Sequence, residues 1–211
     1  MLLGDYFRNS QTATVLGVTI LVTILTILTA LPALAIDARN QGSAIVPIKG
    51  PVTPPDGAAD LCAKYSWACE KSGQIAKGGE GAMGILRAVN SQANRTIKPI
   101  SDLQQYQIKE RWSLPTREGG DCEDYALAKK KELIRIGLST QQFLIATVLD
   151  RKRQSHAVLI VKTGMQDLVL DNLTNKILPW NKTGYTFLRM QDPRNPRLWV
   201  SVLAGGILPL S

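Results

Sequence analysis

Hydrophobic and polar positions follow two different periods along the chain. Between positions 80 and 97, apolar side chains recur at intervals of three and four residues: Met83, Leu86, Val89, Ala93 and Ile97. This spacing is typical of an amphipathic helix, and Pro99 is expected to end it. The pattern before it, over 60–72, also favours a helical region, which Gly73 would stop.

Two more helices are predicted from their end signals. Ser101 is a suitable N-cap for a short helix within 101–112. The run "CEDYALAKKKELIRIG" begins at Cys122, carries acids in its first turn and basic residues later, and reaches a stop at Gly137. Asp121 precedes this run and is predicted to cap it.

The period then changes to that of β-strands. Three short runs rich in β-branched residues, 142–150, 155–162 and 167–171, are separated by "RKRQ" and "TGMQ". They are predicted to form consecutive antiparallel strands, and further strands are expected over 185–190 and 198–203. Helices precede the sheet in the chain, so the fold class expected is α+β.

The first 35 residues are predicted to be a targeting segment. Val15–Ala35 contains no charged residue, Pro32 breaks it, and it ends in the small-x-small sequence Ala33-Leu34-Ala35. A cleaved signal peptide and an uncleaved membrane anchor both fit this pattern, and both place the remainder outside the cytoplasm. Residues 36–59, rich in Pro and Gly, are expected to be an extended linker, followed by a single domain over 60–211.

The net charge of +8 belongs entirely to the exported part, because residues 1–35 hold one acid and one base. The basic runs "KKKELIR" and "RKR" are short and do not interleave with aromatic residues, so nucleic-acid binding is not expected. The charge favours an acidic surface or substrate instead.

Three cysteines in an exported chain allow one disulfide and one leftover thiol. Cys62 and Cys69 are the near pair. On a continuous helix their Cα atoms would be about 10 Å apart, too far for a disulfide, so a bridge requires the segment to turn between them. Cys122 is then a free thiol, either functional or buried and inert.

A thiol nucleophile needs a base and a group that orients the base. The chain contains one histidine, His156, and Asp171 follows at the end of the next predicted strand. Pairing these strands about a turn near residue 164 places 156 opposite roughly 172, so both residues meet at one end of the sheet. A structural histidine and a turn-forming aspartate are the plainer alternatives.

The position of Cys122 at a helix start has two electrostatic consequences. The helix dipole and a protonated His156 would favour the thiolate, against the repulsion from Asp121. Free backbone N–H groups there, including that of Cys122, suit a developing oxyanion.

Three acids flank the cysteine in "GGDCEDY". Asp121, Glu123 and Asp124 form an oxygen cluster that a hard cation such as calcium could occupy. Helix capping and pairing with the helix dipole are the alternative explanation of these acids.

Four motifs in this order resemble one known family. "GGDCEDYALAKK", "SHAVLIV", "LVLDNLTNKILPW" and "GYTFLRMQ" are similar to the bacterial transglutaminase-like cysteine peptidases, which include the periplasmic LapG-type proteases. The resemblance implies a papain-like or transglutaminase-like core, with the nucleophile on a helix packed against an antiparallel sheet. It covers roughly residues 84–200, and the segment around Cys62 and Cys69 resembles a branch common in alphaproteobacteria.

The same resemblance implies a set of site residues and partners. The family's Cys-His-Asp triad falls on Cys122, His156 and Asp171, and its calcium ligands fall on the flanking acids. One branch of the family releases surface adhesins, and so affects biofilms, under an inner-membrane receptor.

The leading hypothesis is therefore an exported thiol peptidase acting on a protein substrate. Transamidation is a second reading, because an amine could capture the same acyl-enzyme intermediate in place of water. A non-catalytic exported binding module is the alternative from another class.

Overall fold

The computed structural model describes residues 43–71 and 80–208. The predicted targeting segment, residues 1–35, and the first part of the predicted linker, 36–42, lie outside the described residues. Within the described ranges, no helix has the length and apolar character needed to cross a membrane.

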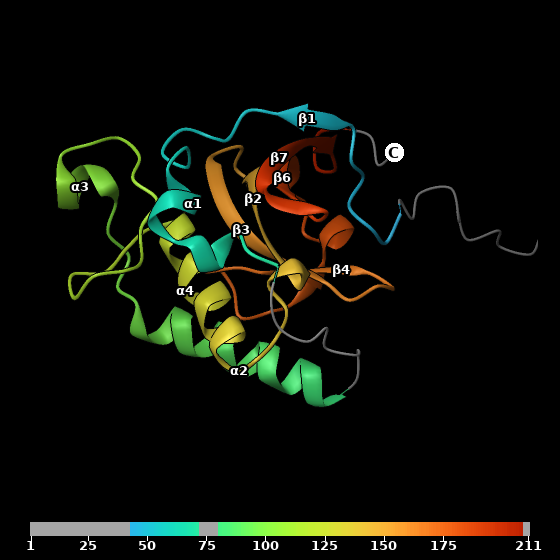
Figure 1. The fold of residues 1–211 in the computed structure, drawn as a ribbon, viewed down its shortest axis with the longest axis horizontal. Helices are drawn as coiled ribbons and strands as arrows, with labels where there is room; N and C mark the ends of the chain where they lie inside the picture. Colours follow the sequence, from blue (N-terminus) through green and yellow to red (C-terminus); the bar gives the residue numbers. More distant parts are fainter. Residues whose placement is uncertain (1–42, 72–79, 209–211) are drawn as a thin grey trace, which may run out of the picture. The chain divides into compact units, whose positions relative to one another are not determined.

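A single antiparallel sheet forms the centre of the described domain (Figure 1). Its order is β1-β7-β6-β2-β3-β4-β5, and every pairing between neighbours is antiparallel. The predicted α+β class is confirmed, and β2, β3, β4, β6 and β7 match the five predicted strands. The strands are β1 (Gly50–Val52), β2 (Phe143–Leu149), β3 (Ser155–Lys162), β4 (Asp167–Leu170), β5 (Leu178–Pro179), β6 (Thr186–Asp192) and β7 (Asn195–Ala204).

The helices differ from the prediction mainly at their ends. Ser101 caps α3 with a full capping box, as expected, but α3 is only five residues long. The helical elements are α1 (Leu61–Lys64), η2 (Ser66–Ala68), α2 (Glu80–Thr96), α3 (Asp102–Tyr106), α4 (Cys122–Arg135), η3 (Thr140–Gln142) and η4 (Trp180–Lys182).

The predicted helix over 60–72 is interrupted at Tyr65. Between α1 and η2 the chain turns, which brings the Cα atoms of Cys62 and Cys69 to 5.5 Å and allows a disulfide between them. The structure thus supplies the turn that a bridge requires.

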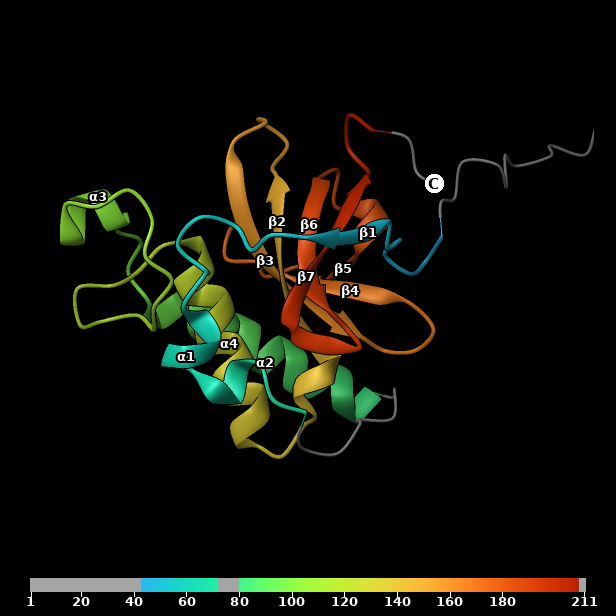
Figure 2. The same ribbon diagram turned by 45° about the horizontal axis from the view of Figure 1, so that its top comes forward.

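The described part of the predicted linker, residues 43–59, packs against the domain. Residues 50–52 form β1, which pairs with β7 at one edge of the sheet (Figure 2). Nearer the start, Val46 N–H donates to the Asp167 carboxylate, 2.8 Å away, and Asp167 N–H donates to Ala44 carbonyl. A three-residue edge strand has too little alternation to be recognised in the sequence.

The sheet buries apolar side chains on both faces. Helices α2 and α4 lie side by side over one face (Figures 1 and 2), where Leu127 and Leu133 of α4 meet Phe143, Ile145 and other strand residues. On the other face, strand side chains pack around Trp180 of η4. The helix-covered face is the one that seats α4 and therefore fixes its first residue, Cys122.

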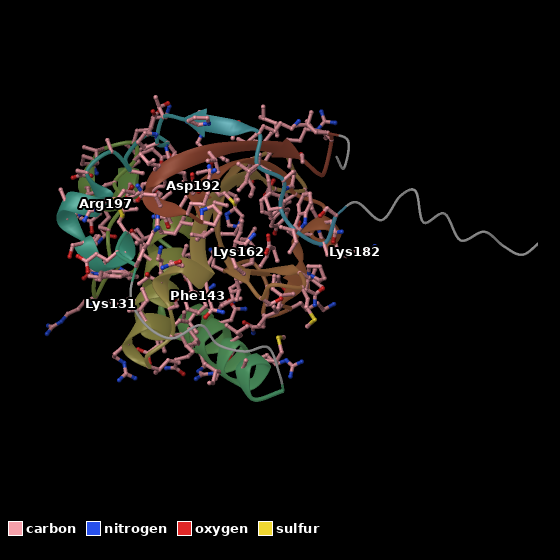
Figure 3. The ribbon with its side chains drawn as sticks, turned by 45° about the vertical axis from the view of Figure 1, so that its right-hand side comes forward. Lys131, Phe143, Lys162, Lys182, Asp192 and Arg197 are labelled. Carbon is pink, nitrogen blue, oxygen red and sulfur yellow. A yellow bond between two sulfur atoms is a disulfide. The ribbon has the colours of Figure 1, made fainter. Side chains whose placement is uncertain are left out.

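Two lysines of α4 are also buried beneath the helix. Lys130 is fully buried and donates to the Gln191 side chain, 2.7 Å away on β6. Burial lowers the pKa of both Lys129 and Lys130 to about 7. Lys131, by contrast, extends from α4 into solvent (Figure 3).

Candidate active site

Cys122 is the first residue of α4, and two glycines precede the helix. Gly120 donates to Lys98 carbonyl at 3.0 Å and accepts from Ile100 N–H at 3.1 Å, which ties the approach to α4 to the end of α2. Gly119 has φ +131°, and a Cβ there would overlap the Lys98 carbonyl oxygen. A glycine is required at 119 because an L side chain rarely adopts this conformation and would have no room.

The thiol of Cys122 contacts strand β3 and the next residue of its own helix. The sulfur accepts a hydrogen bond from Ala157 N–H, and the thiol donates to Glu123 Oε2, 3.3 Å away. Strand β4 pairs with β3 only as far as Leu159, so the N–H of Ala157 lies beyond the paired part of that edge. This leaves it available to the sulfur.

His156 and Asp171 meet as the sequence predicts. The β3–β4 register pairs Leu159 with Leu170, which places position 156 opposite 173, one residue from the predicted partner. His156 Nε2 lies 2.9 Å from Asp171 Oδ1, and the residues are 7% and 3% exposed. Nδ1 is the remaining nitrogen of the imidazole.

Cys122 and His156 line the same cavity, of about 650 Å³. The Arg189 guanidinium donates to Thr53 carbonyl at 3.0 Å, which holds the segment after β1 as one wall. The other lining residues are Pro55, Asp56, Lys109, Glu110, Trp112, Asp121, Glu123, Thr147, Ser155, Ala157 and Leu188. A cleft of this size can hold several side chains of an extended peptide.

The electrostatics at the thiol differ from the prediction. Burial raises the pKa of the Cys122 thiol, and the charge and hydrogen bond of Glu123 raise it further. Ala157 N–H acts in the opposite direction but is the smaller effect. Glu123 therefore raises the pKa of the thiol more than Asp121, the acid whose repulsion the sequence predicts.

The acids around Cys122 gather in a different set from the predicted one. Oxygens of Asp102, Asp121 and Glu123 lie within 4.8 Å of one another. Asp124 points elsewhere and accepts from Ser113 N–H at 2.9 Å. Burial raises the pKa of Asp124 to about 7, and Asp121 and Asp102 add to this effect.

Asp121 is the N-cap residue of α4, as the sequence predicts, but its side chain makes no capping hydrogen bond. Its Oδ2 accepts instead from Asp102 N–H, 3.2 Å away. The remaining oxygen Oδ1 and the Glu123 Oε1 are buried without a hydrogen-bond partner. Burial and the adjacent Asp121 raise the pKa of Glu123 to about 10. Clustered buried carboxylates with unsatisfied oxygens fit a hard cation such as calcium.

Two residues near the predicted site were not found from the sequence. Asp102 lies 19 residues before Asp121, and no spacing rule connects them. Tyr185 donates to Asp171 Oδ2 at 2.6 Å. It occurs in the quoted motif "GYTFLRMQ", but its pattern indicated only a strand.

A protein-family model and several solved structures match this chain. The model of the family described as bacterial transglutaminase-like cysteine proteinase matches residues 48–206. No curated protein matches the chain. Calcium-bound LapG of Legionella pneumophila is 25% identical, with a TM-score of 0.49, over 63% of this chain and 76% of that one. A second LapG structure from that organism is 24% identical, with a TM-score of 0.48, over 61% and 72%.

The family match covers more than half of the chain and includes the helix with Cys122 and the strands with His156 and Asp171. The chain is therefore a cysteine peptidase of the transglutaminase-like type and belongs to the bacterial transglutaminase-like cysteine proteinases.

Proposed function

We propose that this protein is an exported endopeptidase that cuts a protein substrate through Cys122, His156 and Asp171. The observation that carries the proposal is the arrangement at the cavity. The one cysteine outside the disulfide lines it together with the one histidine, and that histidine is hydrogen-bonded to Asp171. A nucleophile, a base and an orienting acid are the groups that acyl transfer requires.

Each residue has a distinct task in the proposed reaction. Cys122 Sγ attacks the scissile carbonyl carbon as its proton passes to His156 Nδ1. The Asp171 carboxylate holds Nε2–H and stabilises the imidazolium that forms. The imidazolium then protonates the leaving amine. Water, deprotonated by the imidazole, attacks the thioester and releases the acid and the free thiol.

The negative charge that develops on the carbonyl oxygen needs donors. The N-terminus of α4 supplies backbone N–H groups without helical partners, and that of Cys122 is adjacent to the reacting carbon. We assign it to the oxyanion site. One such donor commonly contributes about 10²-fold or more to the rate.

Calcium is proposed to bind Asp102, Asp121 and Glu123. A bound cation would satisfy the unpartnered carboxylate oxygens and neutralise the acids on both sides of Cys122. The ligand set therefore shares Asp121 and Glu123 with the one expected from the sequence, and Asp102 takes the place of Asp124.

Thermal unfolding with and without calcium chloride tests this site without measuring activity. Calcium at about 100 times its Kd should add about 2.7 kcal/mol of stability, which raises the midpoint by about 5 to 10 °C. Asp102→Asn should lose the shift, whereas the control Asp124→Asn should retain it. An equal shift in Asp102→Asn would refute the ligand set.

The proposal of export rests on the predicted targeting segment, residues 1–35. A fusion of residues 1–60 to alkaline phosphatase, which is active only outside the cytoplasm, tests it; an inactive fusion would contradict export. The resemblance suggests a surface adhesin as the substrate and an inner-membrane receptor as the regulator. Comparison of surface-protein N-termini between cells with wild type and with Cys122→Ala tests the substrate.

The small activated ester p-nitrophenyl acetate tests the chemistry without knowledge of the substrate. Wild type should release a burst of nitrophenol as Cys122 becomes acetylated, and Cys122→Ala should give none. Added cadaverine distinguishes the two acyl-transfer readings. A peptidase returns mainly acetate, whereas a transamidase returns mainly acetylated amine. The absence of a burst in wild type would favour the binding module.

A further inference from the structure

Asp171 is held by three donors from different parts of the chain. Its Oδ1 faces His156 Nε2 at 2.9 Å and accepts from Leu173 N–H at 3.0 Å. Its Oδ2 accepts from Tyr185 Oη at 2.6 Å. Asp171 and Tyr185 are both buried, so the hydrogen bond between them lies away from bulk solvent.

We propose that Tyr185 is a positioning residue for the reaction, acting through Asp171 and His156. This inference rests on the proposed triad. A carboxylate held at only one oxygen can rotate about its Cβ–Cγ bond, which would carry Oδ1 away from the imidazole. The hydroxyl of Tyr185 fixes the second oxygen, and so fixes the plane in which Oδ1 meets Nε2.

Tyr185 also contacts the base itself. Its ring packs edge-to-face against the imidazole of His156, with centroids 5.8 Å apart and an interplanar angle of 88°. One side chain therefore limits the rotation of both the acid and the base. Because the imidazole is a rigid ring, limiting its rotation also limits the direction of Nδ1, the nitrogen proposed to serve Cys122.

The backbone holds Tyr185 in place before any substrate binds. Gly184 adopts φ +76°, a conformation that favours glycine, and turns the chain into β6. Tyr185 N–H donates to Thr183 Oγ1 at 3.1 Å, and the Thr183 hydroxyl donates to Trp180 carbonyl at 2.7 Å. The Arg151 guanidinium donates to Thr183 carbonyl, 2.8 Å away.

The chemistry of the phenol suits a permanent donor. Burial and the adjacent Asp171 both raise the pKa of Tyr185, so the hydroxyl keeps its proton over the whole range in which a peptidase works. The hydrogen bonds from His156 and Tyr185 lower the pKa of Asp171, so the acceptor remains a carboxylate.

The substitution Tyr185→Phe separates this role from ordinary packing. Phenylalanine keeps the ring against His156 and in the apolar cluster around Trp180, and removes only the hydroxyl. Loss of a buried hydrogen bond to a charged group predicts an acetylation rate with p-nitrophenyl acetate about 10- to 100-fold lower, with little change in KM. The control Tyr65→Phe removes a hydroxyl bonded to Leu114 N–H and should leave the rate unchanged.

A spectroscopic measurement distinguishes positioning from a general loss of structure. The chain contains one histidine, so ¹⁵N-histidine labelling reports His156 alone. Wild type should show a proton fixed on Nε2, and Tyr185→Phe should show mixed tautomers or faster proton exchange. If Tyr185→Phe does not fold, Thr183→Val is used instead, with a smaller rate loss in the same direction expected.

The outcomes separate this inference from the proposed function. A wild-type burst no larger than that of Cys122→Ala would refute the catalytic role of the triad, and with it the positioning role of Tyr185. A normal wild-type burst that persists unchanged in Tyr185→Phe, together with an unchanged imidazole spectrum, would overturn the role of Tyr185 alone.

Discussion

The substitution Asp171→Asn should keep the geometry of the site while removing its charge. Oδ1 lies toward two N–H groups, from His156 and from Leu173. The amide oxygen should therefore occupy this position, and the amide nitrogen should face the Tyr185 hydroxyl. That hydroxyl can accept as well as donate, so the amide fits without a clash, although the Tyr185 O–H proton loses the acceptor that Oδ2 provides.

The magnitude follows from the lost charge. A hydrogen bond to a charged group contributes about 1 kcal/mol more than a neutral one, and this difference is the lower bound on the stabilisation of the imidazolium that Asp171→Asn loses. Two unit charges about 4 Å apart interact by about 4 kcal/mol at an effective dielectric of 20, which is an upper bound. The expected fall in acetylation rate is therefore about 5- to 1,000-fold. A serine triad in which asparagine imposes the wrong histidine tautomer loses about 10⁴-fold.

The burst of nitrophenol from p-nitrophenyl acetate gives the rate, and ¹⁵N-histidine spectra give the tautomer. Asp171→Asn should be slower than wild type with the proton still on Nε2, and Asp171→Ala should be slower again. A 10⁴-fold loss with the proton moved to Nδ1 would refute the orientation assigned to the amide. Full activity would refute a role for the carboxylate charge.

Three further predictions concern the support of the site. Lys130→Met should raise the free energy of unfolding at pH 7 by about 3 kcal/mol. Removing a lysine whose pKa is lowered from 10.5 to about 7 stabilises the fold by about 4 kcal/mol, and losing its hydrogen bond to Gln191 destabilises it by about 1 kcal/mol. Between pH 7 and 10.5 this lysine is protonated in the unfolded chain but neutral in the folded one, so the stability gain of the variant should shrink as the pH rises. Urea denaturation over this pH range measures the gain, and a difference that does not depend on pH would refute the prediction. Gly119→Ala should cost about 2 kcal/mol or more, because its Cβ would overlap the Lys98 carbonyl, and it should also reduce the calcium-induced rise in melting temperature. An unchanged melting temperature would refute this strain. Replacing Cys62 and Cys69 with serine should cost about 2.5 kcal/mol for their seven-residue separation, and an unaltered urea midpoint would show that the bridge is not formed.

The sequence predicts the elements with strong periodicity and misses those fixed by contacts. The three- and four-residue spacing over 80–97 and the β-branched runs correspond to α2 and to five strands. The edge strands β1 and β5 are too short to show a pattern. The break at Tyr65 arises because the disulfide and the packing of Tyr65 on Trp67 favour a turn over continued helix.

The same division holds for the candidate site. His156 and Asp171 were predicted to meet because a hairpin register converts sequence separation into a position. Asp102 reaches Asp121 only because the loop before α4 is tied back to the end of α2, a contact that no local pattern encodes. The influence of Glu123 on the thiol depends on its burial and side-chain direction, and these also require the folded chain.

Mass spectrometry of peptide cleavage tests whether Cys122, His156 and Asp171 together hydrolyse peptide bonds. A mixture of proteome-derived peptides is incubated with wild type and with Cys122→Ala, His156→Ala and Asp171→Ala, and new N-termini are identified. Wild type should give a reproducible set of new termini, Cys122→Ala should give none, and the other two variants should give strongly reduced yields at the same sites. The same termini in Cys122→Ala, or peptides joined through amide bonds with no new termini, would contradict it.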